Sequence, residues 1–140
     1  MTDSSVQLTP EEVEKYDITV VPLTITIDGK SYVDGIDITR SDFVKKMNKA
    51  ESLPKTSQPP IGRFVDVIKN LTADGSQVNG IFLAKSLSGT IDAARQAAEI
   101  AGQSDNVTII DSELTDRAEG FQVLAAAKDA QAGKSMAEII

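Results

Sequence analysis

Two kinds of apolar spacing alternate along the chain, and together they predict an α/β fold. The runs "VNGIFLA" (78–84) and "VTIID" (107–111) are short and apolar on both faces, as in strands buried within a parallel sheet. In the segments 61–71, 89–102 and 114–134, apolar residues recur every three or four positions, which indicates helices. This β-α-β-α order predicts a mostly parallel sheet with helices on both faces, joined by right-handed crossovers.

The helix over 114–134 has an apolar side, on which the pattern places Leu114, Ala118, Phe121 and Ala125. At 140 residues, the chain has the length of one domain with a core of its own. We therefore expect residues 1–140 to form a single domain.

The first part of the chain follows a different pattern. Residues 18–28 are rich in β-branched side chains and predict a strand, in which Pro22 indicates an edge position or a bulge. Thr9 and Thr39 are placed as N-caps of two short helices. Three prolines between 54 and 60 predict an extended segment, because the residue before a proline avoids the helical region.

Hydroxyl side chains follow two of these elements, where a strand or extended segment leads into a helix. "KSLSGT" carries Ser88 beside Gly89, which permits a tight turn, and the free N–H groups of the next helix favour an anion. "KTSQPP" carries Thr56 and Ser57 before another helix. A hydroxyl can donate to a carboxylate or a phosphate, but the same residues can also serve only as helix caps and turns. A third hydroxyl segment at residues 2–5 leads to the hypothesis that all three converge at one sheet edge.

Composition removes several classes of chemistry. The chain has no Cys and no His, which excludes thiolate nucleophiles, disulfides and the commonest metal ligand. Asp3, Asp34, Asp37 and Asp111 match no metal-ligand spacing, so no metal or other cofactor is expected. A net charge of −7 disfavours nucleic acid, and no apolar run approaches the ~20 residues of a membrane span. These features predict a cytoplasmic protein with no integral membrane association.

The motifs in order resemble the amino-terminal half of the DegV family of bacterial fatty-acid-binding proteins. The resemblance covers essentially the whole chain and rests on "TDSS", "EEVEKYDITVVPLTITIDGKSYVDGIDIT", "LPKTSQPP", "SLSGT" and "VTIIDS". Its most specific pieces are "TSQP" and "LSGT". It implies the amino-terminal domain of a two-domain carrier with no enzymatic activity of its own, which holds one long-chain fatty acid. In several members the fatty acid is presented to a separate kinase subunit, which makes an acyl-phosphate.

The same resemblance implies the residues of the site. The carboxylate ligands would be Thr56 and Ser88, with Ser57 and the Gly89 backbone as weaker candidates. Family members also have a short apolar strand before "TDS", so the first strand of the sheet is expected to be missing here. The resemblance also leads to the expectation that the carboxyl-terminal domain is absent from this chain. Two other functions stay open: a protein-interaction or regulatory module without lipid, and a small-molecule enzyme.

Overall fold

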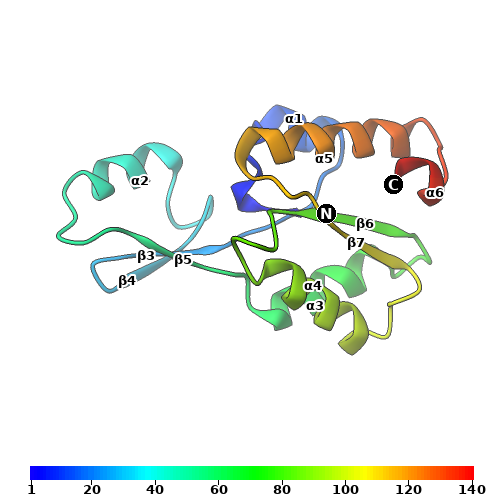
Figure 1. Cartoon of the computed structure of the whole chain (residues 1–140), viewed down its shortest axis with the longest axis horizontal. Helices are drawn as coiled ribbons and strands as arrows, with labels where there is room; N and C mark the ends of the chain where they lie inside the picture. Colours follow the sequence, from blue (N-terminus) through cyan, green and yellow to red (C-terminus); the bar gives the residue numbers. More distant parts are fainter.

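A computed structural model describes residues 1–140, which form a larger α/β body and a smaller lobe (Figure 1). The elements in chain order are β1 (Thr2–Asp3), the 3₁₀ turn η1 (Ser4–Val6), α1 (Pro10–Lys15), β2 (Val20–Val21), β3 (Thr24–Ile27), β4 (Lys30–Val33), α2 (Arg40–Met47), β5 (Lys55–Ser57), α3 (Ile61–Leu71), β6 (Val78–Phe82), α4 (Thr90–Ile100), β7 (Val107–Asp111), α5 (Asp116–Gln131) and α6 (Met136–Ile139). The predicted α/β class is confirmed.

The body is built on parallel strands. β1 pairs in parallel with β2, and β6 pairs in parallel with β7. The backbone of Met1 joins the two pairs, because its carbonyl accepts from the Ile81 N–H at 3.0 Å and its ammonium donates to the Asn79 carbonyl at 2.9 Å. The strands therefore lie in the order β2-β1-β6-β7. The expectation that the first strand is missing was wrong, since β1 is short but present, and Thr2 and Asp3 within it are fully buried.

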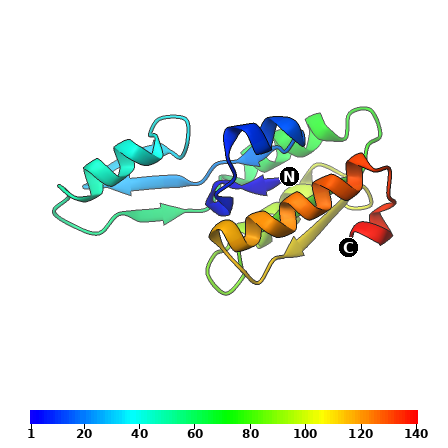
Figure 2. The ribbon, with the colours of Figure 1, turned by 90° about the horizontal axis from the view of Figure 1, so that it is seen from above.

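Helices cover both faces of this sheet, as the pattern predicts. Figures 1 and 2 show α1 and α5 on one face, and α3 and α4 on the other. Beneath α3 and α4 lies the larger apolar cluster, which contains the fully buried Phe64, Phe82 and Ile91. The small buried residues Ala94 and Ala97 let α4 approach the sheet closely.

The side of α5 that faces the core differs from the one that the apolar pattern indicates. Leu114, Ala118, Phe121 and Ala125 are all exposed, and Phe121 is 62% exposed. The buried residues of α5 are Glu119, Gly120, Val123 and Leu124. Since alanines occur all round this helix, its apolar periodicity is weak, and close contact of Gly120 with the amino-terminal segment decides the orientation.

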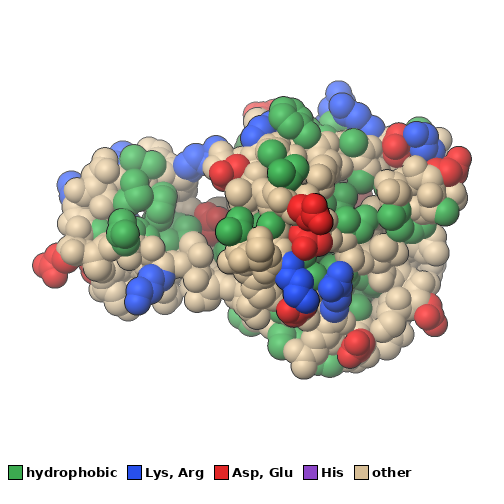
Figure 3. Space-filling view, viewed as in Figure 1, with side chains coloured by type: hydrophobic (Ala, Val, Ile, Leu, Met, Phe, Trp, Pro, Cys, Tyr) green, Lys and Arg blue, Asp and Glu red, His purple; other side chains and the backbone are tan.

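The lobe is a separate antiparallel sheet in the order β4-β3-β5, with α2 packed on one face. The predicted strand over 18–28 is in fact two strands, because the chain leaves β2 at Pro22 and enters β3 in the other sheet. A small cluster of Ile25, Ile27 and Ile38 forms the core of the lobe. Figure 3 shows that a narrow neck joins the lobe to the body.

Candidate functional site

The carboxyl ends of the parallel strands lie at the edge of the sheet that faces the lobe (Figure 1). Two loops leave this edge, one from β6 to α4 and one from β7 to α5. Asp111 joins them, because its Oδ1 accepts from the backbone N–H of Lys85 at 3.2 Å and of Glu113 at 2.9 Å. The Ala84 N–H also donates to the Leu114 carbonyl at 2.8 Å. The loop that carries Ser88 is therefore fixed along its first half.

Ser88 lies just before α4, and Gly89 is the N-cap residue of that helix. The Ser88 hydroxyl oxygen accepts from the Thr90 N–H at 3.3 Å and lies 2.9 Å from the Thr90 hydroxyl oxygen. Thr90 is fully buried, whereas Ser88 is half-buried. When Thr90 donates both bonds, the Ser88 O–H is left to donate outward. Partial capping of α4 and donation to an anion are thus compatible.

Thr56 and Ser57 lie next to each other on β5 and are exposed. Neither hydroxyl has a hydrogen-bond partner within the protein. Thr56 is paired with Ile25 and Ser57 with Thr24 on β3. Because neighbouring residues of a strand point to opposite faces, the two hydroxyls cannot face the same ligand atom from one side of the sheet. At most one of them shares a ligand with Ser88.

The structure brings the "TSQP" and "LSGT" segments together through Gln58 and Gly89. A side chain at position 89 would overlap the Gln58 amide oxygen, so glycine lets this amide lie directly against the backbone. Gln58 is not among the residues that the motifs predict for the site. The only signal for it was the glycine itself, which shows that another group approaches closely but not which one.

Two hollows lie away from these segments. One, of about 680 Å³, lies in the lobe between the β3–β4 hairpin and α2, and its lining includes Lys30, Tyr32 and Lys46. The other, of about 820 Å³, lies at the opposite edge of the sheet near Met1 and Asn79. Neither is lined by a predicted carboxylate ligand.

The third hydroxyl segment, "TDSS", starts at the same edge, but its hydroxyl groups are bonded within the protein. Thr2 donates to Glu119 Oε1 at 3.2 Å, and Ser5 donates to Glu119 Oε2 at 3.0 Å. The Ser4 oxygen accepts from the Leu23 N–H at 3.1 Å. This segment therefore fixes the fold beside the site.

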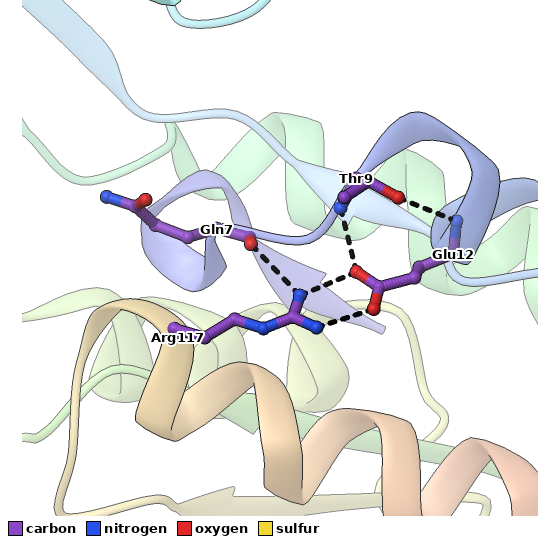
Figure 4. A network of polar contacts seen from close by, with 4 residues as sticks. All are labelled: Gln7, Thr9, Glu12 and Arg117. Carbon is purple, nitrogen blue, oxygen red and sulfur yellow. Dashed lines mark hydrogen bonds and ion pairs between the residues drawn. The ribbon is translucent and has the colours of Figure 1, made fainter.

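A double ion pair holds α1 on α5 (Figure 4). The Arg117 guanidinium donates to both carboxylate oxygens of Glu12 at 2.6 Å, and to the Gln7 carbonyl at 3.3 Å. Glu12 also accepts from the Thr9 N–H at 2.9 Å, which completes the capping box of α1. These hydrogen bonds, those from Arg117 above all, lower the pKa of Glu12 to about 2. The predicted N-cap at Thr9 is confirmed, as is the one at Thr39.

Three of the four acidic residues considered as metal ligands, Asp3, Asp37 and Asp111, have structural roles. No group of three Asp or Glu residues in the chain could hold a metal ion. Asp3 and Asp111 accept backbone N–H groups at the sheet edge, and Asp37 accepts the Val33 N–H at 2.8 Å. These carboxylates stabilise turns.

Lys85, next to the hydroxyl loop, has a partner. Its ammonium lies 2.9 Å from Asp92 Oδ1, with both side chains about half exposed. An exposed pair of this kind contributes roughly 0–1 kcal/mol, so the ammonium remains available to an anionic ligand at small cost.

By its architecture the chain is an α/β domain with a doubly covered parallel sheet, the class in which ligands bind beyond the carboxyl ends of the strands. The chain belongs to the DegV family, since the family model described as "Uncharacterised protein, DegV family" matches residues 1–140. This confirms the resemblance that the motifs indicate. None of its helices is long and apolar enough to cross a membrane.

Relatives with related sequences are about twice as long. The DegV domain-containing protein YejH of Lactococcus lactis is 46% identical over 140 residues, which are 100% of this chain and 49% of YejH. A DegV domain-containing protein of Streptococcus pneumoniae serotype 4 is 45% identical, over 100% of this chain and 50% of its own length. The chain thus spans about half the length of the curated relatives that it matches.

Solved structures share the fold. A stearic-acid-binding protein from Eubacterium ventriosum superposes with a TM-score of 0.91 at 29% identity, over 99% of this chain and 49% of its own. DegV from Bacillus subtilis, described as a fatty acid binding protein, gives a TM-score of 0.89 at 32% identity, again over 99% and 49%. Members of the family with this fold therefore bind fatty acids.

Proposed function

We propose that this chain binds the carboxylate of a long-chain fatty acid with the hydroxyls of Thr56 and Ser88. The observation that carries the proposal is the contact of Gln58 with Gly89, which brings the two hydroxyl segments together at the carboxyl edge of the sheet. The Ser88 O–H can donate outward, and the Thr56 hydroxyl has no partner in the protein. The fatty-acid-binding relatives of the same fold support the same ligand.

The physical chemistry of the site suits a carboxylate. Neutral hydroxyls and the free N–H groups at the start of α4, including those near Gly89, can hold an anion without a buried Lys or Arg. Most of the affinity would come from the acyl tail, at about 0.8 kcal/mol for each buried methylene. Leu87, beside Ser88, is 65% exposed, and Leu114 in the next loop is 40% exposed, so apolar surface adjoins the hydroxyls.

In this proposal the chain is a carrier and performs no chemistry itself. Residues 1–140 would act as the amino-terminal domain, and the bound fatty acid would be presented to a kinase subunit in the cytoplasm for acyl-phosphate formation. The hydroxyl and amide groups of the site offer hydrogen bonds for a carboxylate but no His or Cys to act on it.

The first test is mass spectrometry of lipids extracted from purified protein. The chain would be prepared alone and as a fusion to the carboxyl-terminal half of the Lactococcus lactis relative. We expect one long-chain fatty acid per molecule of the fusion, because the tail needs apolar surface on both halves. Absence of lipid from both forms, with stearate failing to bind on addition, would overturn the carrier function in favour of a protein-interaction module.

The site residues are tested with isosteric or minimal changes in the same fusion. Thr56→Val and Ser88→Ala should each weaken stearate binding by about 1–3 kcal/mol, or roughly 5- to 150-fold, since each removes a hydrogen bond to a charged group. Isothermal titration calorimetry measures the change.

Ser57→Ala is the matched control for Thr56→Val, because Ser57 lies on the same strand but points to the opposite face. Its affinity should stay within about twofold of the parent, that is, within roughly 0.5 kcal/mol. If Ser57→Ala weakens binding as much as Thr56→Val does, the face of β5 has been assigned wrongly. If no variant changes the affinity, these residues are caps and turn formers only.

A further inference from the structure

Two carboxyl groups are fully buried beside the candidate site, and the carboxylate-binding role leaves them unexplained. Asp3 at the end of β1 and Glu119 in α5 both have no exposed surface. Residues of this kind are rarely buried without a compensating partner of opposite charge. The nearest guanidinium on α5, that of Arg117, is bonded to Glu12.

Ser5 connects the two carboxyl groups. Its backbone N–H donates to Asp3 Oδ1 at 2.8 Å, and its hydroxyl lies 3.0 Å from Glu119 Oε2. Ser5 thus contacts Asp3 through its backbone and Glu119 through its side chain. When Glu119 is protonated, its O–H can donate to the Ser5 oxygen in place of the bond that an ionised carboxylate accepts from Ser5.

Neighbouring carboxylates oppose ionisation within this pair. Asp3 and Asp116 both disfavour ionisation of Glu119, and Asp34 acts in the same way on Asp3. Asp3 accepts two backbone N–H groups, from Ser5 and Leu83, whereas Glu119 accepts only from hydroxyls. Since amide donors favour the ionised form, the negative charge belongs on Asp3 and the proton on Glu119.

Asp3 is also a tether for the loop of the site. Its Oδ2 accepts from the Leu83 N–H at 3.1 Å, and Leu83 is the first residue after β6, in the loop that leads to Ser88. A change in the charge of the pair would act directly on this bond, because the anchoring oxygen belongs to the carboxylate that holds the charge.

We propose that Asp3 and Glu119 are positioning residues for the hydroxyl loop, and that a proton held on Glu119 keeps the loop bound to Asp3 at neutral pH. The consequence for a ligand rests on the proposed function, but the tether itself needs no ligand. Ionisation of Glu119 would place two negative charges around Ser5, loosen the amino-terminal turn and free the Leu83 amide.

The titration of Glu119 supports this state. Burial, and next the charge of Asp3, raise the pKa of Glu119 to about 8 from an unfolded value of 4.5. Between these pH values the folded protein keeps a proton that the unfolded chain releases, so stability is full below pH 4.5 and falls as the pH rises toward 8. The N-terminal ammonium, whose pKa is lowered to about 6 by burial, has the opposite effect between pH 6 and 8.

The test compares the wild-type chain with Glu119→Gln, which keeps a neutral side chain able to donate to Ser5. Both proteins keep Met1, so the difference between them isolates Glu119. The unfolding constant of the wild type, relative to that of the variant, should rise nearly tenfold from pH 6 to 7 and about fivefold from pH 7 to 8, as the pH reaches the folded pKa. Urea unfolding at each pH measures it.

Hydrogen exchange of the Leu83 amide tests the tether without any ligand. Its protection factor should fall severalfold in the wild type between pH 6.5 and 9, and stay constant in Glu119→Gln. Parallel pH dependence of the two proteins in both measurements would overturn the proposal, whatever the outcome of the fatty-acid experiments.

Glu12→Gln is the matched control. It makes the same chemical change in the amino-terminal segment and breaks the bonds to Arg117. Because the pKa of Glu12 is about 2, its loss should shift stability by the same factor at every pH from 6 to 9. A slope that changes in Glu12→Gln as it does in Glu119→Gln would mean that general loosening of the segment, and not the proton on Glu119, sets the pH dependence.

Discussion

Phe82→Ala should lower the free energy of unfolding by about 3–5 kcal/mol, the usual result of removing a buried phenyl ring. Phe82 is the last residue of β6 and has no exposed surface. Its ring meets that of Phe64 edge to face, with centroids 5.5 Å apart and an interplanar angle of 88°. The substitution leaves a cavity between the sheet and α3 that neither backbone can close without moving the other.

Urea unfolding followed by circular dichroism measures this loss, and Phe121→Ala provides the matched control. Phe121 is 62% exposed, and the Arg117 guanidinium carbon lies over its ring, 5.2 Å from the centroid. The control should therefore lose no more than about 1 kcal/mol. Equal losses in the two variants would mean that α5 presents Phe121 to the core, as its apolar pattern indicates.

The strands and helices of the body follow from the sequence, because each carries a strong local signal. β6 and β7 are apolar on both faces, and α3 repeats its apolar residues every three or four positions. The division of residues 18–28 between two sheets does not follow in the same way. Pro22 marks an interruption, but where the chain goes next depends on the hydrogen bond of Leu23 with Ser4, which belongs to a distant turn.

The candidate site, too, could be predicted only where its residues carry a local signal. The local sequence shows the hydroxyls of "SLSGT" and "TSQP" and the glycine of "SLSGT", and the family resemblance adds the joint role of the two segments. The contact of Gln58 with Gly89 joins segments 31 positions apart. The contacts of Glu119 with Thr2 and Ser5 span 117 and 114 positions. No local pattern distinguishes this glutamate from the solvated acidic residues, so its burial could only be found in three dimensions.

Gly120→Val should lower the free energy of unfolding by about 3 kcal/mol, at the upper end of the range for overpacking. A Cβ at this position would lie 2.7 Å from the Val6 carbonyl oxygen and 3.3 Å from Leu8 Cδ2. The first of these is a backbone atom at the end of η1, so the turn itself has to shift.

Gly62→Val in α3 is the matched control, since a Cβ there meets nothing within 4 Å and the same substitution is made within a helix. Equal losses in the two variants, measured by urea unfolding, would show that η1 moves away from α5 freely. Because Glu119 bonds Thr2 and Ser5 on that same turn, a shift of η1 also separates these hydroxyls from its carboxyl group. The part of the pH dependence that Glu119 contributes should therefore shrink in Gly120→Val and persist in Gly62→Val, which ties the glycine and the buried proton to one contact.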